Sequence, residues 1–200
     1  MRGAGSGSVV EAKRALRRRV LDTRRDLDAR ALAQSARGLR DVLLAAPEIA
    51  SAGRVAAYVS VGREPGTGPL IEALSADGVD VLLPLLQPDG DLDWAVYEGP
   101  QALISVSRGL LEPTGDPLGP GAVTSADVIL VPGLAVDRRG VRLGRGGGSF
   151  DRALARLAGR AFSCVLLHDG EVLDMPVPRD SHDVPVAAAA TPSSLQRFDR

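Results

Sequence analysis

The sequence contains a single cysteine, Cys164, among its 200 residues. One cysteine excludes a disulfide within the chain and excludes the cysteine pairs of structural zinc sites. No apolar run approaches the roughly 18 residues that a membrane-spanning helix needs. Residues 1–8 are rich in Gly and Ser and lack the apolar core of a secretory signal. We therefore expect a soluble, cytoplasmic protein without a membrane partner.

Aromatic residues are also scarce, at 3% of the chain, and the formal net charge is only −1. Both facts argue against a nucleic-acid-binding module, which combines a basic surface with aromatic side chains. The hydrophobic share of 44% and the charged share of 24% are typical of a globular chain. We expect a flexible tail at residues 1–8 and one domain at residues 9–200, present as a monomer that binds no nucleic acid.

Positive charge is concentrated at the beginning of the chain. The first forty residues contain eleven Lys or Arg and four Asp or Glu. Ser8 to Glu11 form a capping-box pattern, and apolar residues then recur at helical spacing, which predicts a helix from about Val9 to Asp26. Its basic face either binds an anion or is simply solvated, and the pattern alone leaves both readings open.

The remaining chain has the βαβ rhythm of a parallel sheet. Asp28 is a candidate cap for a second helix that ends before Pro47. Strands are predicted at residues 54–60, 79–85, 127–131 and 161–167, with a further candidate at 186–190 and a helix at 67–77. Residues 87–124 are predicted to be irregular around one short strand at 92–97. These patterns predict a single α/β domain of three layers, with a mostly parallel sheet flanked by helices.

The segment from Arg142 to Asp151 is unusually rich in glycine. It reads Arg-Leu-Gly-Arg-Gly-Gly-Gly-Ser-Phe-Asp and follows a predicted hairpin turn at residues 137–140. Glycines let backbone N–H groups converge on an anion, and a helix that starts near Ser149 would direct its positive end there. Arg142 and Arg145 could bind phosphate oxygens, and Asp151 could hold Mg²⁺. Alternatively, the segment is a mobile hairpin tip with solvated arginines, because it matches neither common nucleotide-binding signature.

Residues 131–151 as a whole resemble the signature of the 5-formyltetrahydrofolate cyclo-ligase family. Further landmarks follow in the family's order: residues 13–17, residues 58–64 with Thr67, residues 83–84, residues 112–113 and residues 182–183. The resemblance implies a Rossmann-like or CoA-transferase-like fold. It also implies an enzyme that uses ATP and Mg²⁺ to convert 5-formyltetrahydrofolate to 5,10-methenyltetrahydrofolate, with release of ADP and phosphate.

The resemblance also assigns roles to individual residues. Lys13 and Arg145 would be catalytic. The ATP-binding residues would be Lys13, Arg17, Arg142, Gly144, Arg145, Gly146, Gly147, Gly148, Ser149 and Phe150. The folate would be bound by Val59, Glu64 and Phe150. The Mg²⁺ ligands would be Asp151 and Asp183.

Several positions depart from the family pattern. Ser149 and Phe150 stand where two tyrosines are usual, and Gly147 stands where many members have Lys. Ala187 replaces a common acidic residue. We expect altered affinities from these changes rather than loss of function.

Other residues are left with open roles by the sequence. Tyr58 and Trp94 could stack on the pterin or belong to the core. His182 could assist a metal or phosphate or be only a surface imidazole next to a ligand, and His168, which follows an apolar strand, is expected to be structural. A related α/β enzyme that acts on a phosphorylated small molecule without ATP is the main alternative function, because a fold does not fix a reaction.

Overall fold

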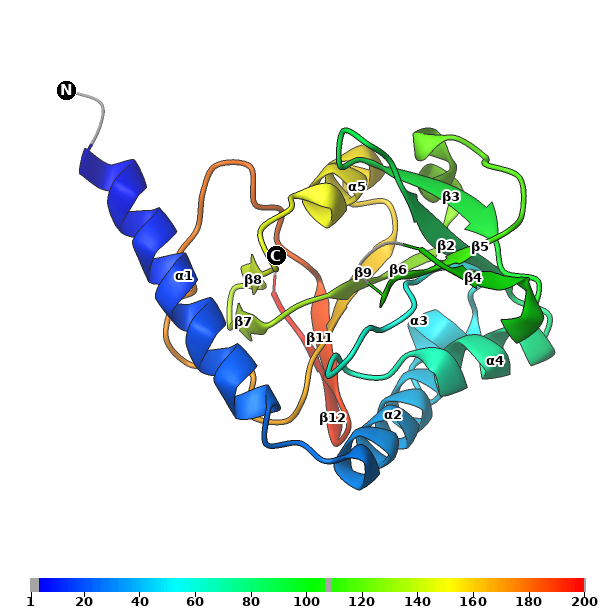
Figure 1. Cartoon of the computed structure of the whole chain (residues 1–200), viewed down its shortest axis with the longest axis horizontal. Coiled ribbons are helices and arrows are strands. Elements are labelled where there is room, and N and C mark those ends of the chain that lie inside the picture. The colour runs from blue at the N-terminus through cyan, green and yellow to red at the C-terminus, as the bar shows by residue number, and fades with distance from the viewer. Residues whose placement is uncertain (1–3, 107–108, 200) are drawn as a thin grey trace.

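The computed structural model describes residues 4–106 and 109–199. At its centre is a seven-stranded sheet in which five neighbouring strands are parallel and both edge strands are antiparallel (Figure 1). In spatial order the strands are β12 (Ser194–Arg197), β11 (Ala188–Thr191), β9 (Phe162–Leu166), β6 (Val128–Pro132), β1 (Arg54–Ala56), β2 (Asp80–Leu86) and β3 (Leu92–Val96). The predicted α/β class with a mostly parallel sheet is confirmed.

Helices cover both faces of this sheet. One face carries α2 (Ala29–Leu44), α3 (Pro47–Ala50) and α4 (Gly68–Ala76), and the other carries α5 (Ser149–Leu157) and the 3₁₀ helix η3 (Pro120–Ser125) (Figure 1). Alternation along β6 explains why: Val128 and Leu130 pack in the core with α2 and α4, whereas Ile129 and Val131 pack in the core with α5. A continuously apolar strand is therefore buried on both sides, as the three-layer prediction requires.

Smaller elements surround the sheet. β7 (Ala135–Asp137), β8 (Arg142–Leu143) and β10 (Val172–Leu173) form a three-stranded sheet, and the predicted turn between β7 and β8 is confirmed, with Gly140 at φ +75°. The prediction of an irregular segment at 87–124 is partly wrong. Besides β3 and η3, it contains η1 (Pro100–Ala102) and a hairpin of β4 (Leu103–Ser105) and β5 (Leu111–Pro113). The sequence analysis also missed β10, which has only two residues, and β12, which is short and mainly polar.

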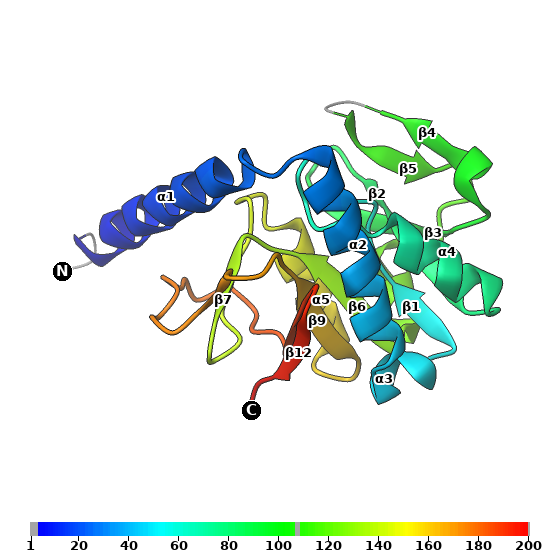
Figure 2. The same cartoon turned by 90° about the horizontal axis from the view of Figure 1, so that it is seen from below.

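The first helix, α1 (Ala4–Arg24), begins earlier than predicted. Ser8 lies inside the helix, so the predicted capping box is wrong. α1 lies at the side of the molecule next to β7 (Figure 2), where Val20 packs against Leu134 and Val141. The division into a tail at residues 1–8 and one domain at 9–200 stays a prediction. No helix in the described ranges is both long and apolar enough to span a membrane.

The strand predicted at residues 54–60 is shorter than expected, because β1 ends at Ala56. The chain then leaves the sheet in a loop that Thr67 closes. The Thr67 hydroxyl donates to the Tyr58 carbonyl at 2.6 Å and accepts from the Ser60 N–H at 3.0 Å. These bonds replace the ladder bonds of a longer strand, and they hold the loop that carries Glu64 at the end of the parallel sheet.

Candidate functional site

The glycine-rich segment lies between β8 and α5, as predicted. Gly146 and Gly148 have φ values of +107° and +72°, a region that side-chain-bearing residues rarely adopt. Gly148 directly precedes the first residue of α5, and no side chain caps the start of that helix. The orphan N–H groups of the first turn thus have no capping side chain, which suits a helix start that receives an anion.

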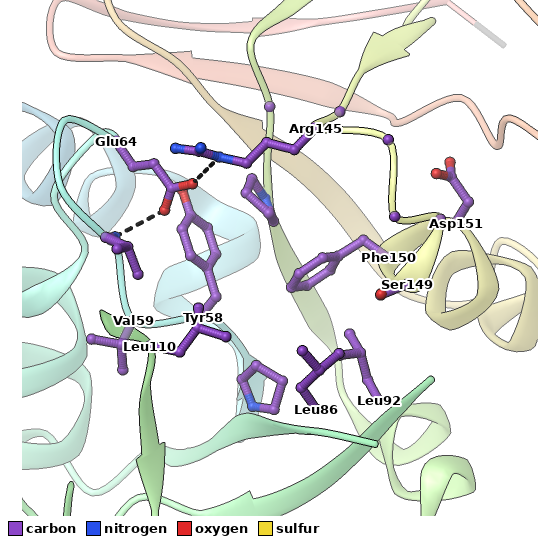
Figure 3. A pocket seen from close by; sticks show the side chains of 18 of the residues that line it. Tyr58, Val59, Glu64, Leu86, Leu92, Leu110, Arg145, Ser149, Phe150 and Asp151 are labelled. Atoms are coloured by element: carbon purple, nitrogen blue, oxygen red, sulfur yellow. Dashed lines mark hydrogen bonds and ion pairs between the residues drawn. The ribbon is translucent and has the colours of Figure 1, made fainter. Parts of the chain in front are cut away.

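A cavity of about 410 Å³ opens between this loop and the end of the sheet (Figure 3). Its size falls within the range of roughly 300–1,000 Å³ that is usual for small-molecule sites. One wall is the glycine loop with the start of α5, formed by Gly144, Arg145, Gly146, Gly147, Gly148, Ser149, Phe150 and Asp151. The opposite wall is mainly apolar and contains Tyr58, Val59, Val61, Glu64, Pro84, Leu86, Leu92, Leu110 and Leu111. The predicted nucleotide loop and the predicted folate segment therefore face one cavity.

Glu64 joins the two walls. Its side chain is 11% exposed, and one carboxylate oxygen accepts from the Val61 N–H at 2.9 Å. The other oxygen accepts from Nε of Arg145, also at 2.9 Å (Figure 3). Arg145 is 57% exposed and reaches Glu64 from the glycine loop. Glu64, which was predicted to bind the folate, and Arg145, which was predicted to bind phosphate, thus form an ion pair across the cavity.

Two aromatic rings line the cavity beside this pair. Tyr58 and Phe150 meet edge to face, with ring centroids 6.1 Å apart. The Tyr58 hydroxyl is buried and has no hydrogen-bond partner among the described residues. Burial and the nearby Glu64 carboxylate raise the pKa of Tyr58 well above its usual value, so the hydroxyl stays protonated. Tyr58 thereby offers a donor that the protein itself does not use.

Arg142 lies deeper than Arg145, with a side chain only 4% exposed. One of its terminal nitrogens donates to Asp151 Oδ1 at 2.9 Å, and the other donates to the Pro132 carbonyl at 3.2 Å. The Val184 N–H approaches the same Asp151 oxygen at 3.3 Å. Arg142 and Asp151 therefore form a largely buried pair next to the end of β6.

α1 supplies two cations next to the glycine loop. Arg17 donates to the Gly144 carbonyl at 2.9 Å. Lys13, four residues earlier on the same helix face, pairs with Asp180 at 2.7 Å and with Asp183 at 2.5 Å. Burial opposes the charge of Lys13, but hydrogen bonds to both carboxylates outweigh it and raise the pKa of the ammonium. The same contacts, against the opposing effect of burial, lower the pKa of Asp183.

The two predicted Mg²⁺ ligands occupy neighbouring but separate positions. Asp151 lines the cavity, whereas Asp183 belongs to a group with Asp180 and His182 whose ligand atoms lie within 4.8 Å of one another. Asp151 and Asp183 each have one carboxylate oxygen that accepts no hydrogen bond from the described part of the chain. Carboxylate oxygens are the ligands that Mg²⁺ prefers, so both residues fit a metal site. Lys13, Arg17 and Asp183 are not part of the cavity lining that the described residues form.

Several other expectations have clear outcomes. Trp94 is completely buried in the core with α5 and does not line the cavity in the described structure. His168 is buried, and its ring nitrogens contact the Ser35 hydroxyl at 3.0 Å and the Arg63 carbonyl at 3.1 Å. Ser149 was predicted to bind ATP, and in the structure its hydroxyl donates to the Gly90 carbonyl at 2.6 Å.

Some residues of the site escaped the sequence analysis. Asp180 shares the Lys13 ammonium with Asp183, and only its spacing of three residues from Asp183 could have suggested it. Leu110 and Leu111 reach the cavity from the β4–β5 hairpin, a segment predicted to be irregular. Arg24 and Glu171 form a buried pair, and they lie too far apart in the sequence for any motif to connect them.

Comparisons with known proteins agree with this geometry. The model of the 5-formyltetrahydrofolate cyclo-ligase family matches residues 9–192. A 5-formyltetrahydrofolate cyclo-ligase of Mycolicibacterium smegmatis is 43% identical over 143 residues, which cover 69% of this chain and 73% of the relative. The enzyme of the same name from Escherichia coli is 33% identical over 152 residues, covering 74% of this chain and 83% of that protein.

Solved structures give the same result. The 5,10-methenyltetrahydrofolate synthetase of Aquifex aeolicus superposes with a TM-score of 0.80 at 26% identity, covering 94% of this chain and 93% of the other. The synthetase of Mycoplasma pneumoniae has the same fold, with a TM-score of 0.70 at 18% identity, covering 90% of this chain and 98% of the other. The chain is therefore an enzyme, and it belongs to the 5-formyltetrahydrofolate cyclo-ligase family.

Proposed function

We propose that the enzyme converts 5-formyltetrahydrofolate to 5,10-methenyltetrahydrofolate in a reaction that consumes ATP, requires Mg²⁺ and releases ADP and phosphate. Membership of the family supports the folate substrate and the cyclo-ligase activity. The observation that carries the finer proposal is the single cavity with two unlike walls. A glycine loop with arginines faces an apolar wall that carries Glu64, so a phosphate donor and a ring system can meet between them.

The chemistry requires activation of a poor leaving group. The formyl oxygen of the substrate first takes the γ-phosphoryl group of ATP, and ADP is released. The lone pair of N10 then attacks the formyl carbon, the C–O bond breaks, phosphate leaves with that oxygen, and N10 loses its proton. Phosphoryl transfer of this kind needs little covalent help from a protein and depends on alignment and positive charge.

Cations of the chain surround the proposed phosphate position. Arg145 and Arg142 line the cavity, and the start of α5 adds backbone N–H groups from Gly148 onward. Lys13 and Arg17 come from α1, where Arg17 already bonds the glycine loop at Gly144. We assign ATP binding to these groups together with the backbone N–H of Ser149 and the ring of Phe150, and we assign the transfer step to Lys13 and Arg145.

The apolar wall is proposed to bind the folate. Glu64 would accept hydrogen bonds from the donor edge of the pterin, because its carboxylate is buried and already held in place by the Val61 N–H. Val59 and the ring of Phe150 would pack on the ring system. The buried Tyr58 hydroxyl would bind a polar edge of the substrate, since it has no partner in the described chain.

Asp151 and Asp183 are proposed to hold Mg²⁺. When bound, Mg²⁺ would neutralise the phosphates and orient them. Arg142 fixes the Asp151 carboxylate through one oxygen and leaves the other oxygen directed to no group of the described chain. We further propose that the enzyme acts as a cytoplasmic monomer and does not bind nucleic acid.

One assay tests the proposal directly. Purified protein is mixed with 5-formyltetrahydrofolate, ATP and Mg²⁺, and the near-ultraviolet absorbance of the methenyl product is followed. We expect a rise that disappears without ATP and in the presence of a chelator. A product that forms equally without ATP, or no product at all, would refute the proposal and favour an α/β enzyme of another chemistry.

A matched pair of variants refines the test. Arg145→Ala removes the exposed cation of the glycine loop, and it should raise the KM for ATP by roughly tenfold or more, because a charged hydrogen bond is worth about 1.5–3 kcal/mol. Arg18→Ala removes an exposed cation of α1 and should leave the KM for ATP and the KM for 5-formyltetrahydrofolate unchanged. Equal effects of the two changes would indicate a general requirement for charge instead of a phosphate contact.

A further inference from the structure

Four side chains that hold α1 in place lie on one face of the helix. Lys13, Arg17, Val20 and Arg24 follow one another at spacings of four, three and four residues, which places them on a single face. Lys13 reaches Asp180 and Asp183, Arg17 reaches the glycine loop, and Val20 joins the small core around β7. Arg24 ends the row. The position of the proposed ATP-binding cations thus depends on a few anchors.

Arg24 is the most deeply buried of these anchors, with only 2% of its surface exposed. Its Nε donates to one oxygen of Glu171 and its Nη2 to the other, each at 2.7 Å, so the two planar groups meet as a fork. Glu171 itself accepts from the His168 N–H at 2.8 Å, which fixes the carboxylate. A bidentate pair defines direction as well as distance, whereas a lysine in its place would act as a point charge.

The same guanidinium is bonded to the cavity wall. Nη2 of Arg24 also donates to the Gly133 carbonyl at 2.8 Å, and Gly133 lines the cavity after β6. A side chain at Gly133 would collide with Val165, so the backbone packs closely against β9 there. Arg24 is therefore attached to one of the most closely packed points of the site.

A second link joins the end of α1 to the folate side. The Arg63 side chain donates to the carbonyl of Arg25, one residue beyond the end of α1, and the Arg63 carbonyl receives a hydrogen bond from His168 Nε2 if that nitrogen carries the proton. Arg63 directly precedes Glu64. The end of α1 is thus connected both to the cavity wall at Gly133 and to the loop that carries Glu64.

We propose that Arg24 and Glu171 are positioning residues that set the rotation and register of α1, so that Lys13 and Arg17 meet the phosphates of ATP. This inference rests on the proposed function. An α-helix turns about 100° and rises about 1.5 Å per residue, so Arg17 and Lys13 lie about two and three turns from Arg24. A slip of one residue at Arg24 would turn both cations away from the glycine loop. Neither Arg24 nor Glu171 needs to touch a substrate.

The burial of the pair supports a role in geometry rather than in stability alone. Charges taken out of water cost free energy that their mutual attraction often fails to recover, so a buried ion pair is weak evidence for stabilisation. Moreover, Nη1 of Arg24 is buried without a hydrogen-bond partner among the described residues. An apolar residue would avoid this cost but would not fix the direction of α1.

The test uses three variants and one control in the complete protein. Arg24→Gln removes the charge and the fork, Arg24→Lys restores only the charge, and Glu171→Gln keeps the shape of the partner. Arg25→Gln is the control, because Arg25 is the next residue of the same helix end and its 76% exposed side chain pairs only with the exposed Asp22. Measured are KM for ATP, KM for 5-formyltetrahydrofolate, and MgATP binding by calorimetry.

We expect Arg24→Gln to raise the KM and the dissociation constant for ATP roughly tenfold or more, since small misplacements of binding groups cost up to about a hundredfold. The KM for the folate should change less than about twofold. Arg24→Lys should recover part of the loss, Glu171→Gln should have a smaller effect of the same kind, and Arg25→Gln should resemble the unchanged protein. Combined with Lys13→Ala, Arg24→Gln should add less than its separate effect, because one of the groups it positions is gone.

Unchanged ATP affinity in Arg24→Gln and Glu171→Gln, together with a lower thermal midpoint, would overturn the inference and leave a purely structural pair. Equal losses for ATP and folate would do the same. If Arg24→Gln does not fold, the ATP and folate measurements on Glu171→Gln and Arg24→Lys test the inference on their own. Failure of the proposed function would look different, because the unchanged protein would then form no product with ATP and Mg²⁺.

Discussion

Replacing Lys13 by alanine should weaken both the fold and the use of ATP, and the size of the first effect follows from the structure. The Lys13 side chain is 8% exposed, and its partners Asp180 and Asp183 are 27% and 12% exposed. Removing the ammonium leaves two nearby carboxylates without their cation. Such a loss costs about 3–5 kcal/mol for a fully buried pair and well under 1 kcal/mol at the surface. For this partly buried group we expect about 2 kcal/mol, or a thermal midpoint lower by roughly 4–8 °C.

The pH dependence of this loss has a defined sign. The pKa of Asp183 is lowered in the folded protein, so its contribution to stability is complete above its unfolded value of 3.8 and is lost as the pH falls through the lower folded value. The pKa of Lys13 is raised, so its contribution is complete below its unfolded value of 10.5 and is lost as the pH rises through the folded value. The difference in stability between the unchanged protein and Lys13→Ala should therefore be largest between these limits and shrink below about pH 4.

Urea unfolding followed by tryptophan fluorescence measures this difference, because Trp94 is the only tryptophan and is completely buried. Arg18→Ala, an exposed change on the same helix, serves as the control. A difference at pH 7 no larger than that of the control would show that the ammonium is not held between the two carboxylates. A difference that persists unchanged at pH 3 would contradict the assigned pKa directions.

Two further variants and one labelling experiment test other parts of the structure. Glu64→Gln keeps an acceptor for the Val61 N–H but removes the charge, so steady-state kinetics should show a KM for the folate raised by about tenfold; an unchanged KM would remove Glu64 from the folate site. Ser149→Ala removes the bond to the Gly90 carbonyl and should cost about 1 kcal/mol in thermal unfolding, with little change in the KM for ATP; a large rise in that KM would mean that the hydroxyl meets phosphate instead. Burial raises the pKa of the Cys164 thiol, so a thiol reagent at pH 8 should label unfolded but not folded protein, and rapid labelling of the folded protein would contradict the buried position.

The strands of the central sheet could be predicted because each has a recognisable pattern in its own local sequence. β6 is a short continuous apolar run between Asp127 and Gly133, and β9 is apolar except for Ser163, which is the pattern of strands covered on both faces. The helix at residues 67–77 was predicted to be closed by Gly78, and the structure has α4 followed by that glycine at φ +81°. Long or strongly apolar elements are therefore readable from residues alone.

The missed elements depend on contacts between distant residues. β10 consists of Val172 and Leu173 and exists because it pairs with β7, about 35 residues earlier. The start of α1 was misplaced because Ser8 and Glu11 matched a capping pattern inside a longer helix. Short edge strands and helix starts have weak local signals, since tertiary pairing or neighbouring residues decide them.

In the candidate site too, local motifs could be predicted, whereas contacts between distant residues could not. The glycine loop and its arginines could be found from one segment, and the structure places them on a cavity as expected. The partners of the cations could not be found, because Asp180 lies 167 residues from Lys13 and Glu64 lies 81 residues from Arg145. Motifs identify which side chains are available, but the fold decides which charges meet.

That pairing has a consequence for binding under the proposed function. Lys13, Arg142 and Arg145 each already have a carboxylate partner, so phosphates that enter must exchange partners rather than meet free cations. Affinity is then the difference between new and lost contacts. Arg145 is 57% exposed and has one partner, so it moves at the lowest cost, whereas Arg142 is 4% exposed with two partners and stays fixed. If Arg145 turns to phosphate as proposed, it would leave Glu64 and free that carboxylate for the folate, so each substrate should bind more tightly in the presence of the other.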